Sequence, residues 1–340
     1  MRRLVFLCLC SLACFYAGAQ DSANLEFVIE QGRITITGYS GNATELVIPR
    51  EIRGMPVVSI GYGAFMNGQL VRLVIPNSVT TIGDKAFYRN RLTGVTFGTG
   101  LRTIGYKSFA NNHLVGLALP RRLVYIGNSA FYGNRISRVA IPDNVTEIGS
   151  EAFAQNRMTR LSIGRGVSVI GESAFADNRL SRVNIPEGLT KIGSRAFADN
   201  QLSELSLSNG LREIGSWAFV NNQLSRLEIP DSVTVILYKA FENNRITALT
   251  LGSGLTAIRE SVFANNLLEH VVIPDQVTVI GERAFAGNLL TEVIIPGSVY
   301  TVGPHAFGED PVTFTYNGKV MITQRELEAA LRKMPSGSFR

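Results

Sequence analysis

The residues able to carry chemistry are few and scattered in this sequence of 340 residues. The three histidines, His113, His270 and His305, do not share the spacing of metal ligands. Serine is plentiful, but no G-x-S-x-G motif, which would mark a nucleophile elbow, occurs. Three short fragments imitate part of a phosphate-binding loop, Gly98-Thr-Gly100, Gly164-Arg-Gly166 and Gly252-Ser-Gly254, yet each occupies a turn at which other repeats have proline. The sequence therefore predicts no catalytic site, no metal site and no cofactor.

Arginine recurs at a fixed spacing over several repeats. One column of side chains, 22 residues apart, contains Arg138, Arg160, Arg182 and, after Glu204, Arg226. A second column, three residues earlier, contains Arg135, Arg157 and Arg179. Like charges about 5 Å apart repel by roughly 1 to 3 kcal/mol, so such columns cost stability. We hypothesise that these seven arginines bind an anionic partner, either an acidic glycan or an acidic protein patch; the alternative is a solvated face whose arginines pair with Asp177, Asp199 or Glu204.

The columns exist because the chain repeats itself without insertion. Phenylalanine recurs every 22 residues from Phe65 to Phe307, isoleucine or finally valine stands five residues before it, and glycine follows that residue except at Leu237 and Arg259. Asparagine lies three residues after the phenylalanine in ten copies, from Asn90 to Asn288. A period of this length indicates a repeat architecture whose units stack on one another.

The consensus N-x-L-x-x-L-x-I-P-x-x-V-x-x-I-G-x-x-A-F-x-x assigns a structure to each part of the unit. The alternating L-x-I segment predicts a short strand with one face inward, and the proline or glycine after it predicts a turn. The V-x-x-I-G-x-x-A-F run fits a tight turn or a short helix that closes the coil, with each phenylalanine stacked on the next. The asparagines are expected to bond buried backbone groups between coils. One unit cannot bury enough apolar surface to fold alone, so the sequence predicts a solenoid of twelve 22-residue coils with parallel strands on one face.

Both ends of the repeat carry hairpin signals that would cap the exposed apolar faces. At the front, LEFVIE and RITITGY flank Gln31-Gly32, followed by a strand over Glu45–Pro49 and a connection through Gly54 and Pro56. At the back, Asn317-Gly318 predicts a tight hairpin, and Thr323 with Glu326 forms a capping box for a helix over 326–333. We expect an N-terminal cap over residues 20–59, the solenoid over 60–307, and a C-terminal cap with a loose tail over 308–340.

The first residues resemble a secretory signal. Arg2 and Arg3 precede an apolar run, and small residues at 17–19 follow it, which predicts cleavage after residue 19. All three cysteines, Cys8, Cys10 and Cys14, fall within this segment; lipidation of Cys14 is the alternative to cleavage at 19. No later run is long enough to span a membrane as a helix. The formal net charge of +6, to which Arg2 and Arg3 contribute, is too small for a nucleic-acid-binding protein.

The repeat itself resembles the BspA-like class of bacterial leucine-rich repeats. Segments such as LSRVNIPEGLTKIGSRAF and LSRLEIPDSVTVILYKAF carry the resemblance, which extends over residues 25–307, although the family unit is usually one residue longer and often has cysteine where this chain has asparagine. The resemblance implies a right-handed leucine-rich solenoid exported to the cell surface or secreted. It also implies a non-enzymatic binding role, with adhesion to host matrix proteins or to other cells. The alternative is a structural scaffold in the periplasm or at the surface.

Overall fold

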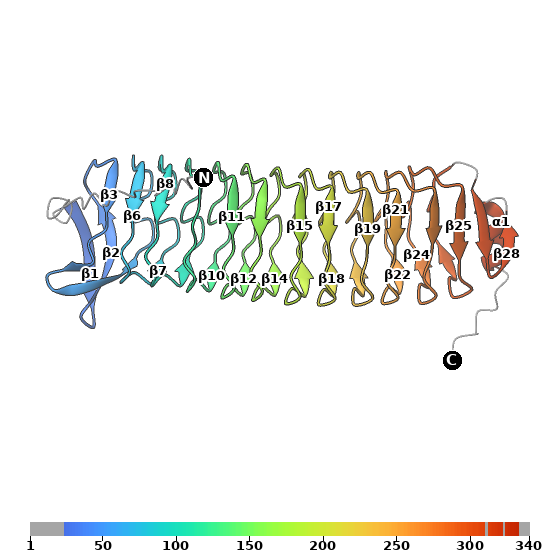
Figure 1. Ribbon diagram of the computed structural model, residues 1–340, viewed down its shortest axis with the longest axis horizontal. Coiled ribbons are helices and arrows are strands. Elements are labelled where there is room, and N and C mark those ends of the chain that lie inside the picture. The colour runs from blue at the N-terminus through green and yellow to red at the C-terminus, as the bar shows by residue number, and fades with distance from the viewer. Residues whose placement is uncertain (1–23, 310–311, 322–323, 333–340) are drawn as a thin grey trace, which may run out of the picture.

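Each 22-residue repeat forms one coil of an elongated stack, with short strands in two rows (Figure 1). The computed structural model describes residues 24–309, 312–321 and 324–332; the predicted signal segment and the capping residue Thr323 lie outside them. The prediction of a parallel solenoid of 22-residue coils with hairpin caps is confirmed.

The first row, which we call the strand face, is built from the L-x-I segments, as expected. Its side chains alternate strictly: Val139 is buried, whereas Arg138 and Ala140 beside it are exposed. The strands of this face are β3 (Glu45–Val47), β6 (Arg72–Val74), β8 (Gly94–Thr96), β11 (Arg138–Ala140), β13 (Arg160–Ser162), β15 (Arg182–Asn184), β17 (Glu204–Ser206), β19 (Arg226–Glu228), β21 (Ala248–Thr250), β23 (His270–Val272), β25 (Glu292–Ile295) and β27 (Thr313–Tyr316).

The second row was not predicted from the sequence. The residue before each repeat isoleucine and the isoleucine itself form a two-residue parallel strand, so the run expected to be only a turn or helix contains a strand followed by a turn. These strands are β5 (Met55–Ile60), β7 (Thr81–Ile82), β9 (Thr103–Ile104), β10 (Tyr125–Ile126), β12 (Glu147–Ile148), β14 (Val169–Ile170), β16 (Lys191–Ile192), β18 (Glu213–Ile214), β20 (Val235–Ile236), β22 (Ala257–Ile258), β24 (Val279–Ile280) and β26 (Thr301–Val302). We call them the second sheet.

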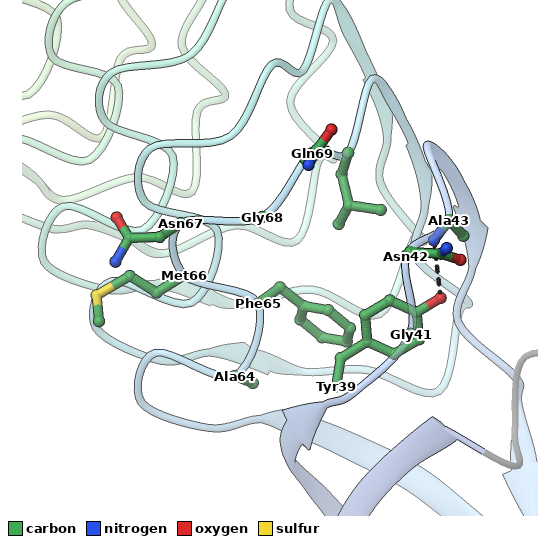
Figure 2. A pocket seen from close by; sticks show the side chains of 11 residues that line it. Tyr39, Gly41, Asn42, Ala43, Ala64, Phe65, Met66, Asn67, Gly68 and Gln69 are labelled. Atoms are coloured by element: carbon green, nitrogen blue, oxygen red, sulfur yellow. Dashed lines mark hydrogen bonds between the residues drawn. The ribbon is translucent and has the colours of Figure 1, made fainter.

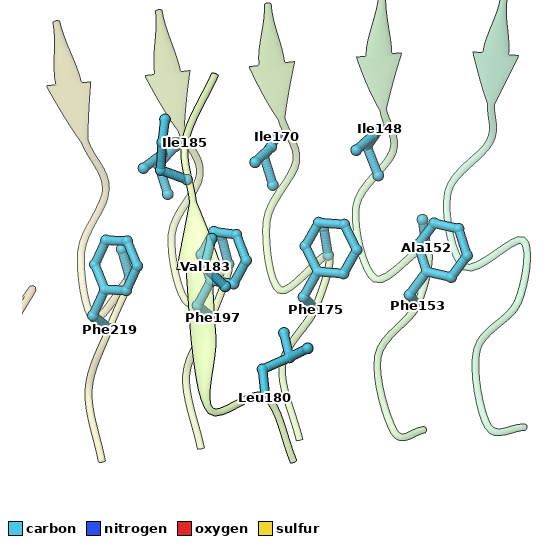
Figure 3. Close-up of a cluster of buried hydrophobic side chains, with 14 of the residues drawn as sticks. Ile148, Ala152, Phe153, Ile170, Phe175, Leu180, Val183, Ile185, Phe197 and Phe219 are labelled. Carbon is cyan, nitrogen blue, oxygen red and sulfur yellow. The ribbon is translucent and has the colours of Figure 1, made fainter. Parts of the chain in front are cut away.

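A single file of phenylalanine rings forms the core between the two rows. From Phe65 to Phe307, neighbouring rings stack with centroids 5.0–5.8 Å apart and planes within 4–17° of parallel, a favourable offset arrangement. Figure 3 shows Phe153, Phe175, Phe197 and Phe219 in this file, with Ile170 on one side. The predicted stacking is therefore confirmed.

The asparagine column is confirmed as a buried polar ladder. In the coil of Phe175, the Asn178 amide donates to the carbonyl oxygens of Phe175 (3.1 Å) and of Phe153 in the preceding coil (3.0 Å). Its Oδ1 accepts the backbone N–H of Met158 at 3.0 Å. All ten asparagines repeat these bonds, and each is buried, so the corner between the turn and the strand face is satisfied internally in these ten coils.

The turn after the second sheet, which we call the turn face, contains two left-handed residues in most coils. In one coil these are Ser173 (φ 52°) and Asp177 (φ 54°), on either side of Ala174 and Phe175. Left-handed backbone costs about 1–2 kcal/mol for a residue other than glycine. The stacked phenylalanine and the asparagine bonds hold the turn in this conformation.

Hairpins close both ends of the file. At the front, β1 (Leu25–Glu30) and β2 (Arg33–Tyr39) pair antiparallel, and the Tyr39 ring lies 5.5 Å from that of Phe65. The connection expected through Gly54 and Pro56 is itself a hairpin of β4 (Glu51–Ile52) with β5. At the back, β27 pairs antiparallel with β28 (Lys319–Met321), and Phe314 lies 5.1 Å from Phe307. The predicted helix is α1 (Gln324–Arg332), and it buries Leu327.

The two rows differ in continuity. The second sheet is unbroken from β5 to β20 and is interrupted between β20 and β22. The strand face is divided into short ribbons, β3-β6-β8, β11-β13, β15-β17, β19-β21 and β23-β25-β27-β28. The ribbons follow an alternation in the sequence, because repeats with Pro after the strand alternate with repeats that have Gly or Ser there through most of the stack.

Glycine at that position lets one coil lie directly against the proline coil before it. A Cβ added to Gly164 would lie 2.4 Å from the carbonyl oxygen of Pro142, and the same holds for Gly98 against Pro76 and Gly252 against Pro230. The backbone N–H in the middle of each G-x-G fragment then donates to the Asp or Asn after that proline, as from Arg165 to Asp143 at 2.9 Å. The fragments that imitate a phosphate loop are therefore joints between two coils.

Candidate ligand-binding face

The first arginine column lies on the strand face, where the period-two alternation turns its side chains outward. Arg138, Arg160, Arg182 and Arg226 are the first residues of β11, β13, β15 and β19, and all four are exposed. Each is followed by a buried Val or Leu or, in β13, by the half-buried Leu161. The strand therefore fixes the base of each arginine while its guanidinium group remains in solvent.

The structure brings Arg138 and Arg160 together but does not give one continuous column. These two residues are directly opposed in the β11–β13 ladder, so two like charges are neighbours. Arg182 opposes Glu204 and forms an ion pair with it at 3.7 Å. Arg226 lies beyond Glu204 and opposes Ala248.

The second column contains Arg135, Arg157 and Arg179, each directly after an asparagine of the buried ladder. Their backbone N–H groups donate to the preceding coil, as from Arg157 to the Ile136 carbonyl at 3.0 Å, and all three side chains are exposed. These residues are fixed at the corner that leads into the strand face.

The proposed pairing of the arginines with acidic neighbours holds for one of them. Arg182 pairs with Glu204, whereas Asp199 pairs with Arg195 on the turn face at 2.9 Å. Within the described part of the chain, no carboxylate lies within 4 Å of the other six arginines of the two columns. Most of the positive charge on this face is therefore available to a partner.

A depression of about 680 Å³ separates two ribbons of the strand face. It lies where β13 and β15 do not pair, and its lining is Thr159, Arg160, Leu161, Ser181 and Arg182. Two guanidinium groups thus share this lining with a half-buried leucine and two hydroxyl groups. Thr159, Ser181 and Leu161 were not identified from the sequence as candidate binding residues. The alternation of Pro and Gly after the strand was the sequence signal for the gap between β13 and β15.

A second cavity, of about 290 Å³, lies where the front cap meets the first coil (Figure 2). Gly68 occupies the position that asparagine fills in later coils, so the ladder ends here and leaves space beside Phe65 and Tyr39. The Tyr39 hydroxyl accepts the backbone N–H of Ala43 at 3.4 Å. The lining contains no carboxylate, imidazole, thiol or amine, and the Tyr39 phenol is its one titratable group.

The histidines lie apart from one another, as their spacing predicted. His270 is 3.8 Å from Glu292 on the strand face, and His305 is 3.6 Å from Glu309 near the back end. Among the residues that the structure describes, no group of three or more His, Cys, Asp or Glu side chains could hold a metal ion. In the same part of the chain, no helix is long and apolar enough to cross a membrane.

The family of the chain follows from its repeat. The model of the BspA type leucine rich repeat region matches residues 58–180 and 190–313, in six copies. These segments amount to well over half of the sequence, so the chain belongs to the BspA-type leucine-rich repeat family. A comparison with curated protein sequences finds none that matches.

Solved structures show the same fold at low sequence identity. A leucine-rich repeat protein from Bacteroides ovatus is 22% identical with a TM-score of 0.59, over 86% of this chain and 98% of that one. A leucine rich cell surface protein from Faecalibacterium prausnitzii is 24% identical with a TM-score of 0.51, over 87% and 94%. The pneumococcal vaccine antigen PcpA is 16% identical with a TM-score of 0.52, over 87% and 86%. Repeat solenoids of this kind present extended binding surfaces and bind other proteins.

Proposed function

We propose that this chain is exported to the cell surface and binds an acidic protein surface through the strand face, as an adhesin for host matrix proteins or for other cells. Export rests on residues 1–19, which have the pattern of a signal peptide. Surface display is supported by similarity to the cell surface protein of Faecalibacterium prausnitzii.

The observation that carries the proposal is the uncompensated charge of Arg138 and Arg160. The two side chains are opposed in one ladder, and in the described chain neither has a carboxylate within 4 Å. Opposed like charges destabilise a sheet. Arginine binds carboxylates in a two-pronged geometry, so an acidic partner would offset a cost that the free protein bears.

The depression between β13 and β15 supports a protein partner. Its lining includes Arg160, Arg182 and Leu161, a side chain that packs against the core and is only half buried. A carboxylate flanked by an apolar side chain would engage both kinds of group, as interface anchors commonly do. A flat array of charge alone would offer no such anchor.

The test is a binding measurement with charge-reversed variants. In the test variant, Arg138, Arg160, Arg182 and Arg226 are replaced by glutamate; in the matched control, the exposed residues Arg102, Arg122, Arg212 and Arg283 are replaced instead. Purified protein is titrated against immobilised fibronectin and fibrinogen at several salt concentrations. We expect the test variant to lose binding and the wild type to show a salt dependence that the variant lacks.

Unchanged affinity in the test variant, or an equal loss in the control, would reject the proposal. A salt-independent interaction of the wild type would also reject it. Circular dichroism of both variants verifies that the solenoid remains folded.

One observation favours a second candidate, a scaffold at the surface or in the periplasm. Arg72 pairs with Glu45 at 3.7 Å and Arg182 with Glu204 at 3.7 Å, so parts of the strand face neutralise themselves. Protease treatment of intact cells separates the candidates: a surface protein is cleaved, and a periplasmic one is protected until the outer layer is opened.

A further inference from the structure

The turn face carries a cluster that the arginine columns do not involve. It consists of Tyr62, Lys85, Tyr106 and Lys107, and we call it the tyrosine–lysine patch. The Lys85 ammonium lies 5.6 Å from the ring centre of Tyr62 and 6.0 Å from that of Tyr106, and it donates to the Tyr62 hydroxyl at 3.4 Å. The Lys107 ammonium lies 5.0 Å from the Tyr106 ring. Cations and aromatic rings thus alternate along three successive coils.

The 22-residue period builds this cluster. Tyr62 and Tyr106 occupy the same position two coils apart, about 10 Å along the axis from the spacing of strands. Lys85 and Lys107 are the left-handed residues of their turns, with φ of 55° and 51°. The Asp84 carboxylate accepts the Tyr106 backbone N–H at 2.8 Å and holds the neighbouring turns together.

The patch is positively charged, with two exposed tyrosines and two half-buried lysines. Tyr62 is 65% exposed and Tyr106 is 38% exposed. Within the described residues, neither lysine has a carboxylate within 4 Å, and Arg89 beside Tyr88 adds a further cation. Hydrogen bonding to Tyr106, the largest contribution, raises the pKa of Lys107, so its ammonium stays charged.

The rest of the turn face has a different charge pattern. Further along the stack its charged side chains are of both signs, with the acidic residues Glu151, Glu172, Asp177, Asp199, Glu242, Glu260 and Glu282 more numerous than the basic residues Arg195, Lys239 and Arg283. Two of these basic residues, Arg195 and Lys239, are paired with Asp199 and Glu242.

Three backbone N–H groups in and next to the tyrosine–lysine patch are already used between coils. The N–H groups of Gly63, Lys85 and Lys107 donate to the carbonyls of Asp84, Tyr106 and Asn128 in the next coil. A peptide could not pair with these groups as an added strand, because that mode depends on free backbone groups. A ligand here must instead meet hydroxyl and ammonium groups.

We propose that the tyrosine–lysine patch binds an anionic glycan, a segment of sulfated or uronic-acid-containing oligosaccharide. Such a ligand offers many oxygen acceptors to ammonium and phenol groups, and its sugar faces suit exposed aromatic rings. The spacing of Tyr62 and Tyr106 is one that a short oligosaccharide can bridge, with Lys85 between them.

The chain supplies matched controls on the same molecule. Lys191 pairs with Glu213 at 3.0 Å and Lys239 pairs with Glu242 at 3.7 Å, so both cations are already neutralised. Tyr238 has the same repeat position as Tyr106, but its ring packs edge-on against Trp217 with centroids 4.6 Å apart.

The experiment measures binding of the purified protein to heparin hexasaccharide and to hyaluronan hexasaccharide by calorimetry at two salt concentrations. The double variant Lys85→Ala/Lys107→Ala is compared with Lys191→Ala/Lys239→Ala, and Tyr62→Phe/Tyr106→Phe with Tyr238→Phe. We expect the first lysine pair to weaken binding about tenfold and to reduce its salt dependence, because two ion contacts with the glycan are lost. The second pair should leave binding unchanged. If heparin binds and hyaluronan does not, the patch recognises sulfate groups. If both probes bind, it recognises the carboxylate groups that they share.

Four results would overturn the proposal. Equal losses in the two lysine pairs would show a response to overall charge, and unchanged affinity in the first pair would exclude the patch. Binding of a polyglutamate peptide that is as tight as heparin and is lost with Lys85 and Lys107 would indicate a protein partner. Loss of glycan binding in the strand-face arginine variant but not in the lysine variant would also contradict it. This outcome does not depend on whether the strand face binds an acidic protein.

Discussion

The strand face and the second sheet are two sides of the same coils, but the second sheet is interrupted once along the described stack, whereas the strand face is cut into five ribbons. In the second sheet, glycine after each isoleucine lets the coils approach, and a Cβ on Gly215 would lie 2.5 Å from the backbone nitrogen of Ser194. That sheet breaks where Leu237 is followed in the next coil by Arg259. On the strand face, glycine or serine occurs only in some repeats, and the sheet is cut into ribbons. Between β11 and β21, the strands pair where a small residue follows the second strand, whereas β3–β6 and β23–β25 pair with proline after both strands.

Removing one phenylalanine ring from the core should destabilise the strand face and the second sheet alike, because both rows of strands pack against the same rings. Phe175 is fully buried between Phe153 and Phe197, with centroids 5.5 and 5.3 Å away. We expect Phe175→Ala to lower the free energy of unfolding by about 3–5 kcal/mol. Chemical denaturation followed by circular dichroism measures this. A loss below about 1 kcal/mol would mean that the file does not hold the coils together.

A Cβ placed at one closed joint should open the strand face alone. In Gly98→Ala the new Cβ would meet the Pro76 carbonyl oxygen at 2.2 Å, whereas a Cβ on Gly94 in the same coil meets nothing within 4 Å. We expect Gly98→Ala to cost about 1–3 kcal/mol, and Gly94→Ala to be neutral or slightly stabilising.

Amide exchange identifies the joint that opens. The Ile75 N–H donates to the Thr96 carbonyl at 2.9 Å across it, so its exchange should accelerate in Gly98→Ala and not in Gly94→Ala. Ser208 shows that a side chain is tolerated at this position when its hydroxyl bonds the preceding proline carbonyl, at 2.9 Å to Pro186. Gly98→Ser should therefore be milder than Gly98→Ala. Equal stability of the Ala variants at 94 and 98 would refute the role of the joint.

Restoring glycine at the interrupted joint should extend the second sheet. Gly281 donates its N–H to the Ile258 carbonyl at 2.7 Å, but among the described residues no such bond joins Arg259 to Ile236. We expect Arg259→Gly to form that bond and slow amide exchange at residue 259. The Leu237 N–H donates to the Ile214 carbonyl at 2.9 Å, so a single side chain at this position is tolerated, and the break occurs where two coils in succession lack glycine. The gain in stability should be under about 1 kcal/mol, because glycine also loses more backbone entropy on folding.

The repeat made most of the fold predictable from the sequence. Phe175 and Asn178 recur in register, and their stacking and buried hydrogen bonds are both confirmed. The second sheet was not predicted, because two-residue strands such as Lys191–Ile192 are too short to show an alternation of apolar and polar residues. The left-handed conformation of Lys85 or Trp217 was likewise invisible, since neither residue type favours it and packing imposes it.

The sequence predicted which arginines lie on the candidate site, but it did not predict which of them lie next to one another. The 22-residue spacing placed Arg138 and Arg160 on one face, and the structure puts them in one ladder. The gap before Arg182 depends on whether coils pair, which a reading of single repeats does not reveal. The tyrosine–lysine patch escaped notice because Tyr62 and Lys85 occupy different positions of different repeats and meet only across coils.

The smallest expected effect concerns the carboxylate that spans one closed joint. The Ser253 backbone N–H donates to Asp231 at 2.7 Å, and this bond, the largest contribution, lowers the pKa of the Asp231 carboxyl. A pKa that is lower in the folded than in the unfolded protein gives stability that is present above the unfolded value of about 3.9 and is lost as the pH falls through the folded value. The Asp231→Asn variant should therefore lose less stability than the wild type as the pH falls below about 3.9, and the rest of its acid transition should be unchanged.

The matched control is Asp275→Asn, because Asp275 follows Pro274 in the same way but, in the described chain, accepts no such bond from the next coil. Denaturation midpoints between pH 7 and pH 2, with a carbon-13 titration of Asp231, measure the effect; an identical acid response of the two variants would show that the bond across the joint contributes nothing.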